Sequence, residues 1–228
     1  MRVCVVVYNV RGFRDGSERL VRLVDHFRPD VLLLNETGAR WRLRRFARAL
    51  GMELAADPWS PFRRRVKDAV LVRPPWWVVE HRQHRFEGGP WLYPRGALVA
   101  MLEEGDARLC AISMHLGLHP RERLAHARAL VGLVEGVGAP IVAGGDLNET
   151  PDGRAAGFLS ERFRDAWQLG GEGEGETFPA GEPTARIDYL FVTDGIVVER
   201  VLVPPGPDAR EASDHRPLVA ELTLPGPE

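Results

Sequence analysis

Acceptor-rich side chains occur in five parts of the chain, each directly after or inside an apolar run. Several carboxylates that converge on one point repel one another unless a cation or a proton compensates their charge. Oxygens from Asp, Glu and Asn form a hard ligand set that suits Mg²⁺ or Mn²⁺. The pattern therefore favours a divalent cation site made of oxygen ligands. The five parts are Tyr8-Asn9-Val10-Arg11-Gly12, Leu34-Asn35-Glu36, Ser113-Met114-His115-Leu116, Gly144-Gly145-Asp146-Leu147-Asn148, and the pair Arg186-Ile187-Asp188-Tyr189 with Ser213-Asp214-His215-Arg216-Pro217.

The elements that must position these residues follow from the hydrophobic pattern, which alternates short β-rich runs with amphipathic segments. Strands over residues 2–10 and 30–34 are joined by a helix over 17–27, with Ser17 as its N-cap. Strands over 109–114 and 141–143 are joined by a helix over 121–135. The other predicted elements are a helix over 40–50, strands over 69–72, 77–80, 97–102, 187–192 and 218–222, and a mobile glycine-rich loop over 170–176.

The two strand–helix–strand units form a faint internal repeat. In the first, Asn9 and Glu36 follow buried strands and lie 27 residues apart. In the second, His115 and Asp146 follow buried strands and lie 31 residues apart. Ligand sites of α/β folds lie at the carboxyl ends of strands. Two such halves packed face to face would bring all four side chains to one edge.

Composition excludes several classes of protein. The chain has 228 residues, 44% apolar and 27% charged, with a formal net charge of −2. These values exclude wholesale disorder, a collagen-like repeat and a membrane bundle. No linker divides two cores, which predicts a single domain over residues 1–228. The first apolar stretch is too short for a secretory signal, so a cytoplasmic location and no membrane span are predicted.

Charge is unevenly distributed along the chain. Residues 1–100 hold nine more basic than acidic side chains, and residues 101–228 hold eleven more acidic than basic ones. The simplest interpretation is a solvated surface. A functional interpretation is that arginines of the first half contact phosphate, because a guanidinium binds phosphate through two donors. The clusters concerned are Arg42, Arg44, Arg45 and Arg48, and Arg63, Arg64 and Arg65.

Taken in this order, the motifs resemble the endonuclease/exonuclease/phosphatase superfamily. It includes pancreatic deoxyribonuclease, abasic-site endonucleases, neutral sphingomyelinases and inositol polyphosphate 5-phosphatases. The resemblance runs from Asn9 to Pro217. It implies an α/β fold of the deoxyribonuclease type, a four-layer α/β/β/α sandwich of two mixed sheets with an internal pseudo-repeat. It also implies a metal-dependent phosphoric ester hydrolase.

The resemblance implies a role for each matching residue. Glu36 would be the principal Mg²⁺ ligand, with Asn9 and Asp214 beside it and Mn²⁺ as a substitute. Two arginines would contact the substrate phosphate: Arg95, and Arg11, which stands where abasic-site endonucleases have an acidic residue. Asn35 stands in place of the glutamine that commonly precedes the metal-binding glutamate.

The remaining matches imply catalytic roles. Asp146 would orient or deprotonate the attacking water, and Asn148 would donate to a phosphate oxygen. His215 would lie against the phosphate, with Asp188 accepting from its other ring nitrogen. His115 resembles a second catalytic histidine that stabilises charge on the phosphate or the leaving oxygen.

Three functions remain open at this level. The first is a phosphodiesterase that hydrolyses nucleic acid through in-line attack by an activated water, favoured by the arginine-rich first half. The second is a phosphohydrolase of a small or lipid-like phosphate ester. The third is a binding protein with a degenerate site, which the complete set of motif residues disfavours. No protein partner is evident from the sequence.

Residues outside the motifs are predicted to have structural roles. Trp59, Trp76-Trp77 and Trp91 could stack on bases, but packing at the rim and in the core is the preferred interpretation. His126 is predicted to lie on the surface. Cys4 and Cys110 lie inside apolar runs and are predicted to be buried free thiols.

Overall fold

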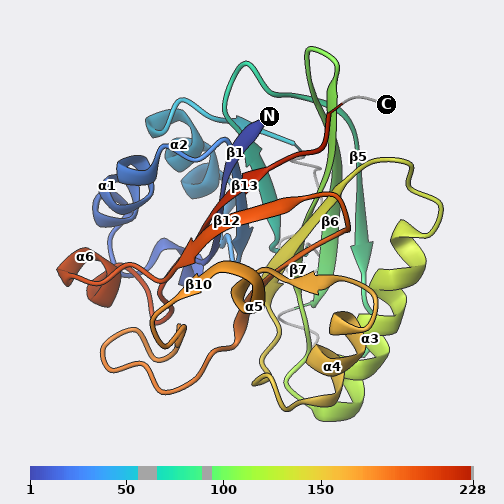
Figure 1. Cartoon of the computed structure of the whole chain (residues 1–228). Coiled ribbons are helices and arrows are strands. Elements are labelled where there is room, and N and C mark those ends of the chain that lie inside the picture. Colours follow the sequence, from blue (N-terminus) through green and yellow to red (C-terminus); the bar gives the residue numbers. More distant parts are fainter. Residues whose placement is uncertain (56–65, 89–93, 227–228) are drawn as a thin grey trace.

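The computed structural model describes residues 1–55, 66–88 and 94–226. Within them, two mixed sheets face each other (Figure 1). The first sheet has seven strands in the order β10-β12-β13-β1-β2-β4-β3: β1 (Arg2–Asn9), β2 (Val31–Asn35), β3 (Glu53–Leu54), β4 (Ala69–Val72), β10 (Gly171–Glu172), β12 (Val197–Leu202) and β13 (Leu218–Thr223). The second has six strands in the order β5-β6-β7-β8-β11-β9: β5 (Trp77–Arg85), β6 (Gly96–Glu104), β7 (Ala107–His115), β8 (Ile141–Asp146), β9 (Arg164–Asp165) and β11 (Asp188–Val192).

Helices cover the outer face of each sheet (Figure 1). Apolar residues of α1 (Ser17–Phe27), α2 (Arg40–Ala49) and α6 (Pro207–Glu211) pack on the first sheet. Those of α3 (Pro120–Val134) and α4 (Arg154–Ser160) pack on the second. The result is the predicted four-layer α/β/β/α sandwich. The short helix α5 (Ala166–Gly170) and a 3₁₀ turn, η1 (Arg11–Phe13), complete the described elements. No helix among these residues is both long and apolar enough to cross a membrane.

Strand β1 shows how the sequence builds the layers. Alternate side chains of a strand point to opposite faces of its sheet. Val5 and Val7 lie in the core between the two sheets, with Leu98 and Ala111 of the second sheet. Val6 points the other way, into the core beneath the helices. Both faces of β1 are therefore buried, which explains its continuous apolar run.

The internal repeat is present in the topology. Strands β1 and β2 are parallel and joined by α1, and β7 and β8 are parallel and joined by α3. Each crossover places two strands side by side with their carboxyl ends at the same edge.

Several local predictions are wrong. The N-cap of α1 is Gly16, and Ser17 is the first helical residue. Residues 170–176 are not wholly a loop, because Gly171–Glu172 pairs with β12. At Gly171 and Gly175 a Cβ would meet the ring of Trp167 within 3 Å, so absence of a side chain lets the segment pack there. His126 is buried rather than exposed, with Nδ1 accepting from the Gly117 N–H and its ring stacked on Phe86.

Candidate active site

Strand ends from both sheets meet at one edge. In the first sheet, Asn9 at the end of β1 pairs with Asn35 at the end of β2. In the second, Asp146 at the end of β8 pairs with His115 of β7 and with Asp188 of β11. Nδ2 of Asn9 donates across the gap to Oδ2 of Asp146 over 3.1 Å. The two halves of the repeat therefore contact each other at their polar ends.

Asp146 lies at the centre of this edge. Its side chain is 3% exposed and also accepts a hydrogen bond of 2.8 Å from the backbone N–H of Asn148. Its Oδ2 lies 3.2 Å from Nε2 of His115 and 3.7 Å from Nε2 of His215. One buried carboxylate thus joins groups from both sheets and from the loop before β13.

The protonation of His215 follows from its partners. Its Nδ1 lies 2.8 Å from Oδ2 of Asp188. Burial alone would lower the pKa of the imidazole, but Asp188, Asp146 and Asp214 together raise it to about 10. His215 is therefore a cation at neutral pH. Its Nδ1 proton is held by Asp188, and its Nε2 proton is available to Asp146 or to a bound anion.

Arg95 determines the tautomer of His115. A guanidinium has donors and no acceptor, and Nη1 of Arg95 lies 2.8 Å from Nδ1 of His115. Nδ1 must therefore accept, which leaves the ring proton on Nε2, the nitrogen beside Asp146. The contact arises because Arg95 immediately precedes β6, where Gly96 is in register with His115.

The charge state of Asp146 reflects these neighbours. Burial alone would raise the pKa of its carboxyl, but His115, His215 and the Asn148 N–H hold it well below its usual range. Asp146 is therefore ionised and acts as an acceptor. The amide of Asn148 is oriented by donation to the Leu116 carbonyl over 3.1 Å.

Glu36 lies at the same edge, and its carboxylate oxygens are available to bind a cation. Its side chain is 32% exposed, and Oε1 lies 3.8 Å from Nη1 of Arg95. No donor among the described residues makes a hydrogen bond to this carboxylate. Nearby, Arg11 contacts two further oxygens: its backbone N–H donates to Oδ1 of Asn9 over 3.1 Å, and its side-chain Nε lies 3.2 Å from Oδ2 of Asp214. Two carboxylates and an amide oxygen fit a hard divalent cation.

A second group of possible ligands fits a cation less well. One ligand atom each of Asp146, Asp188 and His215 lies within 4.8 Å of the others. A metal-bound imidazole nitrogen carries no proton. The raised pKa of His215 and its hydrogen bond to Asp188 therefore make this group an ion-pair network instead.

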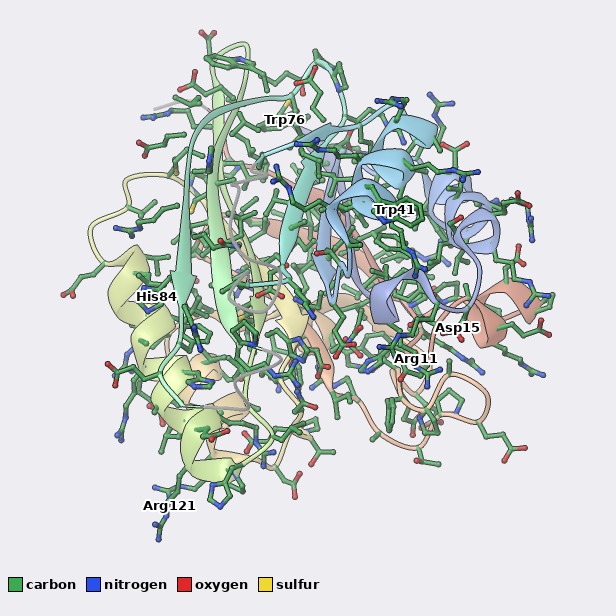
Figure 2. The ribbon with its side chains drawn as sticks, turned by 180° about the vertical axis from the view of Figure 1, so that it is seen from behind. Arg11, Asp15, Trp41, Trp76, His84 and Arg121 are labelled. Carbon is green, nitrogen blue, oxygen red and sulfur yellow. The ribbon has the colours of Figure 1, made fainter. Side chains whose placement is uncertain are left out.

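All the predicted site residues are linked through these contacts. Those joined through Asp146 are Asn9, His115, Asn148, Asp188 and His215, and those joined through arginines are Glu36, Arg95, Arg11 and Asp214. Figure 2 shows Arg11 beside Asp15, with which it forms an outer ion pair of 3.4 Å.

Unusual backbone conformations coincide with these residues. Non-glycine residues with positive φ include Arg11 at 44°, Glu36 at 53° and Asn148 at 52°. Such conformations cost about 1 kcal/mol or more each and persist where the surrounding structure enforces them. Each of the three follows a strand of the edge, where the chain turns sharply away from the sheet.

Two buried residues behind the site have structural roles that the sequence did not predict. Asn35 belongs to one of the acceptor-rich segments but was given no role of its own; its Oδ1 accepts from the Asp146 N–H and its Nδ2 donates to the Met114 carbonyl, both over 2.9 Å. Asp68 accepts from the same Nδ2 over 2.9 Å. Burial raises the pKa of Asp68 to about 7. An acidic residue directly before a fully apolar strand, here β4, was the available signal.

Other candidates lie elsewhere. Trp76 is buried between the sheets, which agrees with a packing role. Trp77 begins β5 opposite Glu103, at the end of the sheet far from His115. Trp59, Trp91 and the cluster of residues 63–65 lie outside the described residues. Cys4 and Cys110 are free thiols; Cys110 is buried and Cys4 is half-buried.

Comparison with known proteins identifies the family. Residues 6–215 match the sequence model of the endonuclease/exonuclease/phosphatase family. The chain belongs to this family. It is accordingly an enzyme that hydrolyses phosphoric esters. No curated protein resembles the chain closely enough in sequence to be a significant match.

Solved structures of the same fold differ widely in sequence. An endonuclease/exonuclease/phosphatase from Bacteroides vulgatus has a TM-score of 0.85 and 17% identity, covering 98% of this chain and 99% of that one. A mannosyl-6-phosphatase from Bacteroides thetaiotaomicron has a TM-score of 0.81 and 20% identity, covering 97% and 100%. D. rerio TDP2, complexed with a single-strand DNA product, has a TM-score of 0.79 and 17% identity, covering 98% and 99%.

Proposed function

We propose that the protein is a Mg²⁺-dependent phosphodiesterase acting on nucleic acid, with Mn²⁺ able to replace Mg²⁺. The observation that carries this proposal is the contact of Asn9, His115 and His215 with the single ionised carboxylate of Asp146. This arrangement pairs a water-orienting acceptor with donors for a phosphate. Arginines at the rim and the likeness to TDP2 with its DNA product favour nucleic acid as the substrate. A single domain and a cytoplasmic location remain part of the proposal.

The chain's own residues supply most of the chemistry. Asp146 accepts from the attacking water and orients it toward phosphorus, its low pKa keeping it ionised. Protonated His215 donates from Nε2 to a non-bridging oxygen, and Asp188 holds the ring. Asn148, Arg11 and Arg95 donate to the phosphate as negative charge builds up on its oxygens. His115 donates from Nε2, the nitrogen beside Asp146, and stabilises charge on the leaving oxygen.

The cation is assigned to Glu36, Asn9 and Asp214. A bound divalent cation neutralises phosphate charge and polarises the P–O bond. Arg11 and Arg95, which are assigned to the phosphate, are separate side chains that lie beside Asp214 and Glu36. We therefore expect metal affinity and the phosphate contacts to be separable by mutation.

The test is a parallel assay of the purified protein on supercoiled plasmid, single-stranded DNA, RNA and bis-p-nitrophenyl phosphate with Mg²⁺, Mn²⁺ or EDTA. Metal-dependent cleavage of nucleic acid that is lost in His215→Ala and in Asp146→Asn supports the proposal. Cleavage that persists in both variants points to a contaminating nuclease and contradicts the assigned chemistry.

Glu36→Gln tests the metal assignment. The amide keeps the size of the side chain but removes a charged ligand, so the Mg²⁺ concentration for half-maximal activity should rise at least about tenfold. Isothermal titration with Mn²⁺ should show the same weakening without any substrate. An unchanged titration would remove Glu36 from the ligand set.

A small phosphate ester is the second candidate substrate. The specific observation in its favour is the likeness to a mannosyl-6-phosphatase, which covers that chain completely. Hydrolysis of mannose 6-phosphate or bis-p-nitrophenyl phosphate, with every nucleic acid left intact, would favour this candidate over the first.

A further inference from the structure

A cavity of 270 Å³ lies beside the proposed site, between the loop that follows β1 and the loop that follows β2. Four cationic side chains line it, Arg11, Arg14, Arg42 and Lys67, together with one carboxylate, Glu36. They come from three parts of the chain, the loop after β1, helix α2 and the segment before β4, which the fold brings together. Such an excess of positive charge in a concave site favours an anionic ligand.

The described residues offset this charge only in part. Arg11 pairs with two aspartates. Nη1 of Arg42 donates to the Gly12 carbonyl over 3.0 Å, which fixes its guanidinium against the loop. Arg14 is exposed, and in residues 1–55, 66–88 and 94–226 it has no ion-pair partner. An anion in the cavity would supply the negative partner that Arg14 lacks among these residues.

Bare backbone forms another part of the lining. Gly12 and Gly38 both line the cavity, with φ angles of 67° and 59°. A Cβ on Gly38 would lie 2.9 Å from Cα of Gly12. Side chains are therefore excluded at the point where the two loops touch. The backbone of Gly12 and Gly38 forms that part of the cavity wall, and the cationic side chains form the rest.

The start of helix α2 contributes to the same field. Its N-cap, Ala39, lines the cavity and has no side chain that could cap the helix. A helix N-terminus carries a partial positive charge and commonly lies against phosphate groups. Its contribution adds to that of the four cationic side chains.

The cavity also shares walls with the proposed site. Glu36 approaches Arg95 on the side of His115, and Arg11 reaches Asp214. A group held in the cavity would therefore lie next to a phosphate held at Asp146. A substrate with one phosphate, held at Asp146, would leave Arg14 without an anionic partner among the described residues.

We infer that this cavity binds a second phosphate group of the substrate, beside the phosphate that is hydrolysed. The inference rests on the proposed function and narrows the substrate class of the same site to esters that carry two phosphates. Adjacent phosphates of a nucleic acid strand and the two phosphates of a small nucleoside bisphosphate share this chemistry.

Three chromogenic esters test the inference: thymidine 5′-(p-nitrophenyl phosphate), the same ester with a 3′-phosphate, and the corresponding 5′-ester of a tetrathymidylate. In the wild-type protein, the second phosphate should raise kcat/KM by about tenfold or more, the effect of one charge-assisted contact. In Arg14→Gln combined with Lys67→Gln, this gain should largely disappear. Arg2→Gln, an exposed arginine at the opposite end of β1, is the matched control and should keep the gain.

The outcomes separate the two proposals. A gain with the tetrathymidylate alone identifies a strand as the source of the second phosphate, and a gain with the bisphosphate identifies a small molecule. The absence of a gain with either ester, or a gain that persists in the double variant, overturns the inference while the proposed function stands. No hydrolysis of any ester contradicts both. Thermal unfolding checks that the variants fold, and Arg14→Gln alone replaces the double variant if that variant does not.

Discussion

At the scale of single residues, each histidine of the site has a charged partner at Nδ1. Arg95 donates to Nδ1 of His115 and so places the ring proton on Nε2. Asp188 accepts from Nδ1 of His215 and makes that ring a cation. Both rings therefore present an Nε2–H group toward the same carboxylate, Asp146. The partner at Nδ1 is a cation for His115 and an anion for His215.

Replacing Asp188 by Asn should move the pH dependence of the reaction. The wild-type pKa of His215 is about 10, so the cation persists through neutral pH. Loss of the Asp188 charge should return the pKa toward the ordinary value of about 6.5. We expect kcat/KM of the variant to fall above about pH 6.5, whereas that of the wild type should fall only near pH 10. Matching pH profiles would show that His215 does not act as a cation.

At the scale of elements, the amide of Asn35 joins the two sheets behind the site. It connects the end of β2 with the backbone of β7 and β8 through hydrogen bonds to Met114 and Asp146. Asp68, just before β4, fixes the amide by accepting from the same nitrogen. The side chains at the edge are therefore positioned by a buried polar contact as well as by strand register.

Asp68→Asn should change how stability depends on pH. The pKa of Asp68 is raised to about 7 in the folded chain and is about 3.9 in the unfolded chain. The folded state therefore binds the proton more tightly than the unfolded state. As a result, the free energy of unfolding falls as pH rises from 4 to 7. The amide cannot ionise, so the variant should gain on the order of 4 kcal/mol of stability relative to the wild type between pH 4 and pH 8.

Urea unfolding of the Asp68→Asn variant and of the wild type at both pH values, in EDTA, measures this difference. Asp68→Ala serves as the comparison, because it removes the charge and also the hydrogen bond to Asn35. A constant difference between the wild type and Asp68→Asn across the pH range would mean that Asp68 is ionised throughout.

At the scale of the whole molecule, one core joins the two halves of the repeat. Val7 and Leu33 of the first sheet and Val142 and Leu190 of the second lie in the same buried cluster. Neither sheet can expose that face to water without losing the packing of the other. The two halves of the repeat therefore share one core and do not pack independently.

A single unfolding transition should follow from this shared core. We expect the urea transitions monitored by tryptophan fluorescence and by far-ultraviolet circular dichroism to coincide. Leu33→Ala should shift both curves equally, by about 2–5 kcal/mol, since it opens a cavity between the sheets. Two separated transitions would contradict the single-domain prediction.

The sequence predicted the elements that are buried and periodic. Strands such as β4 are continuous apolar runs, and the alternation of strands and helices indicated the layers. Strand β12 was missed because half of its residues are exposed and only one is buried, and β5 was predicted too short because none of its residues is buried. The helices α4, α5 and α6 have only five to seven residues, too few for a helical pattern to be recognised.

The candidate site was predictable in its members but not in its contacts. The motif residues are local features of the chain, so a single sequence identifies them. The pairing of Arg95 with His115 depends on the register of β6 and β7. The support of Asp146 by Asn35 crosses between sheets. Contacts of this kind follow from tertiary packing, which no local pattern records.

The left-handed backbone at Glu36 has a consequence for evolution and engineering. Its φ of 53° suits glycine, and its carboxylate makes no hydrogen bond within the described part of the chain. Glu36→Gly should therefore raise the free energy of unfolding in EDTA by about 0.5–1 kcal/mol, while Glu36→Gln should not. The glycine variant should also lose its response to Mg²⁺. Screening for thermal stability alone would then select inactive protein, because the backbone at this proposed metal ligand is strained and a more stable residue there cannot bind the cation.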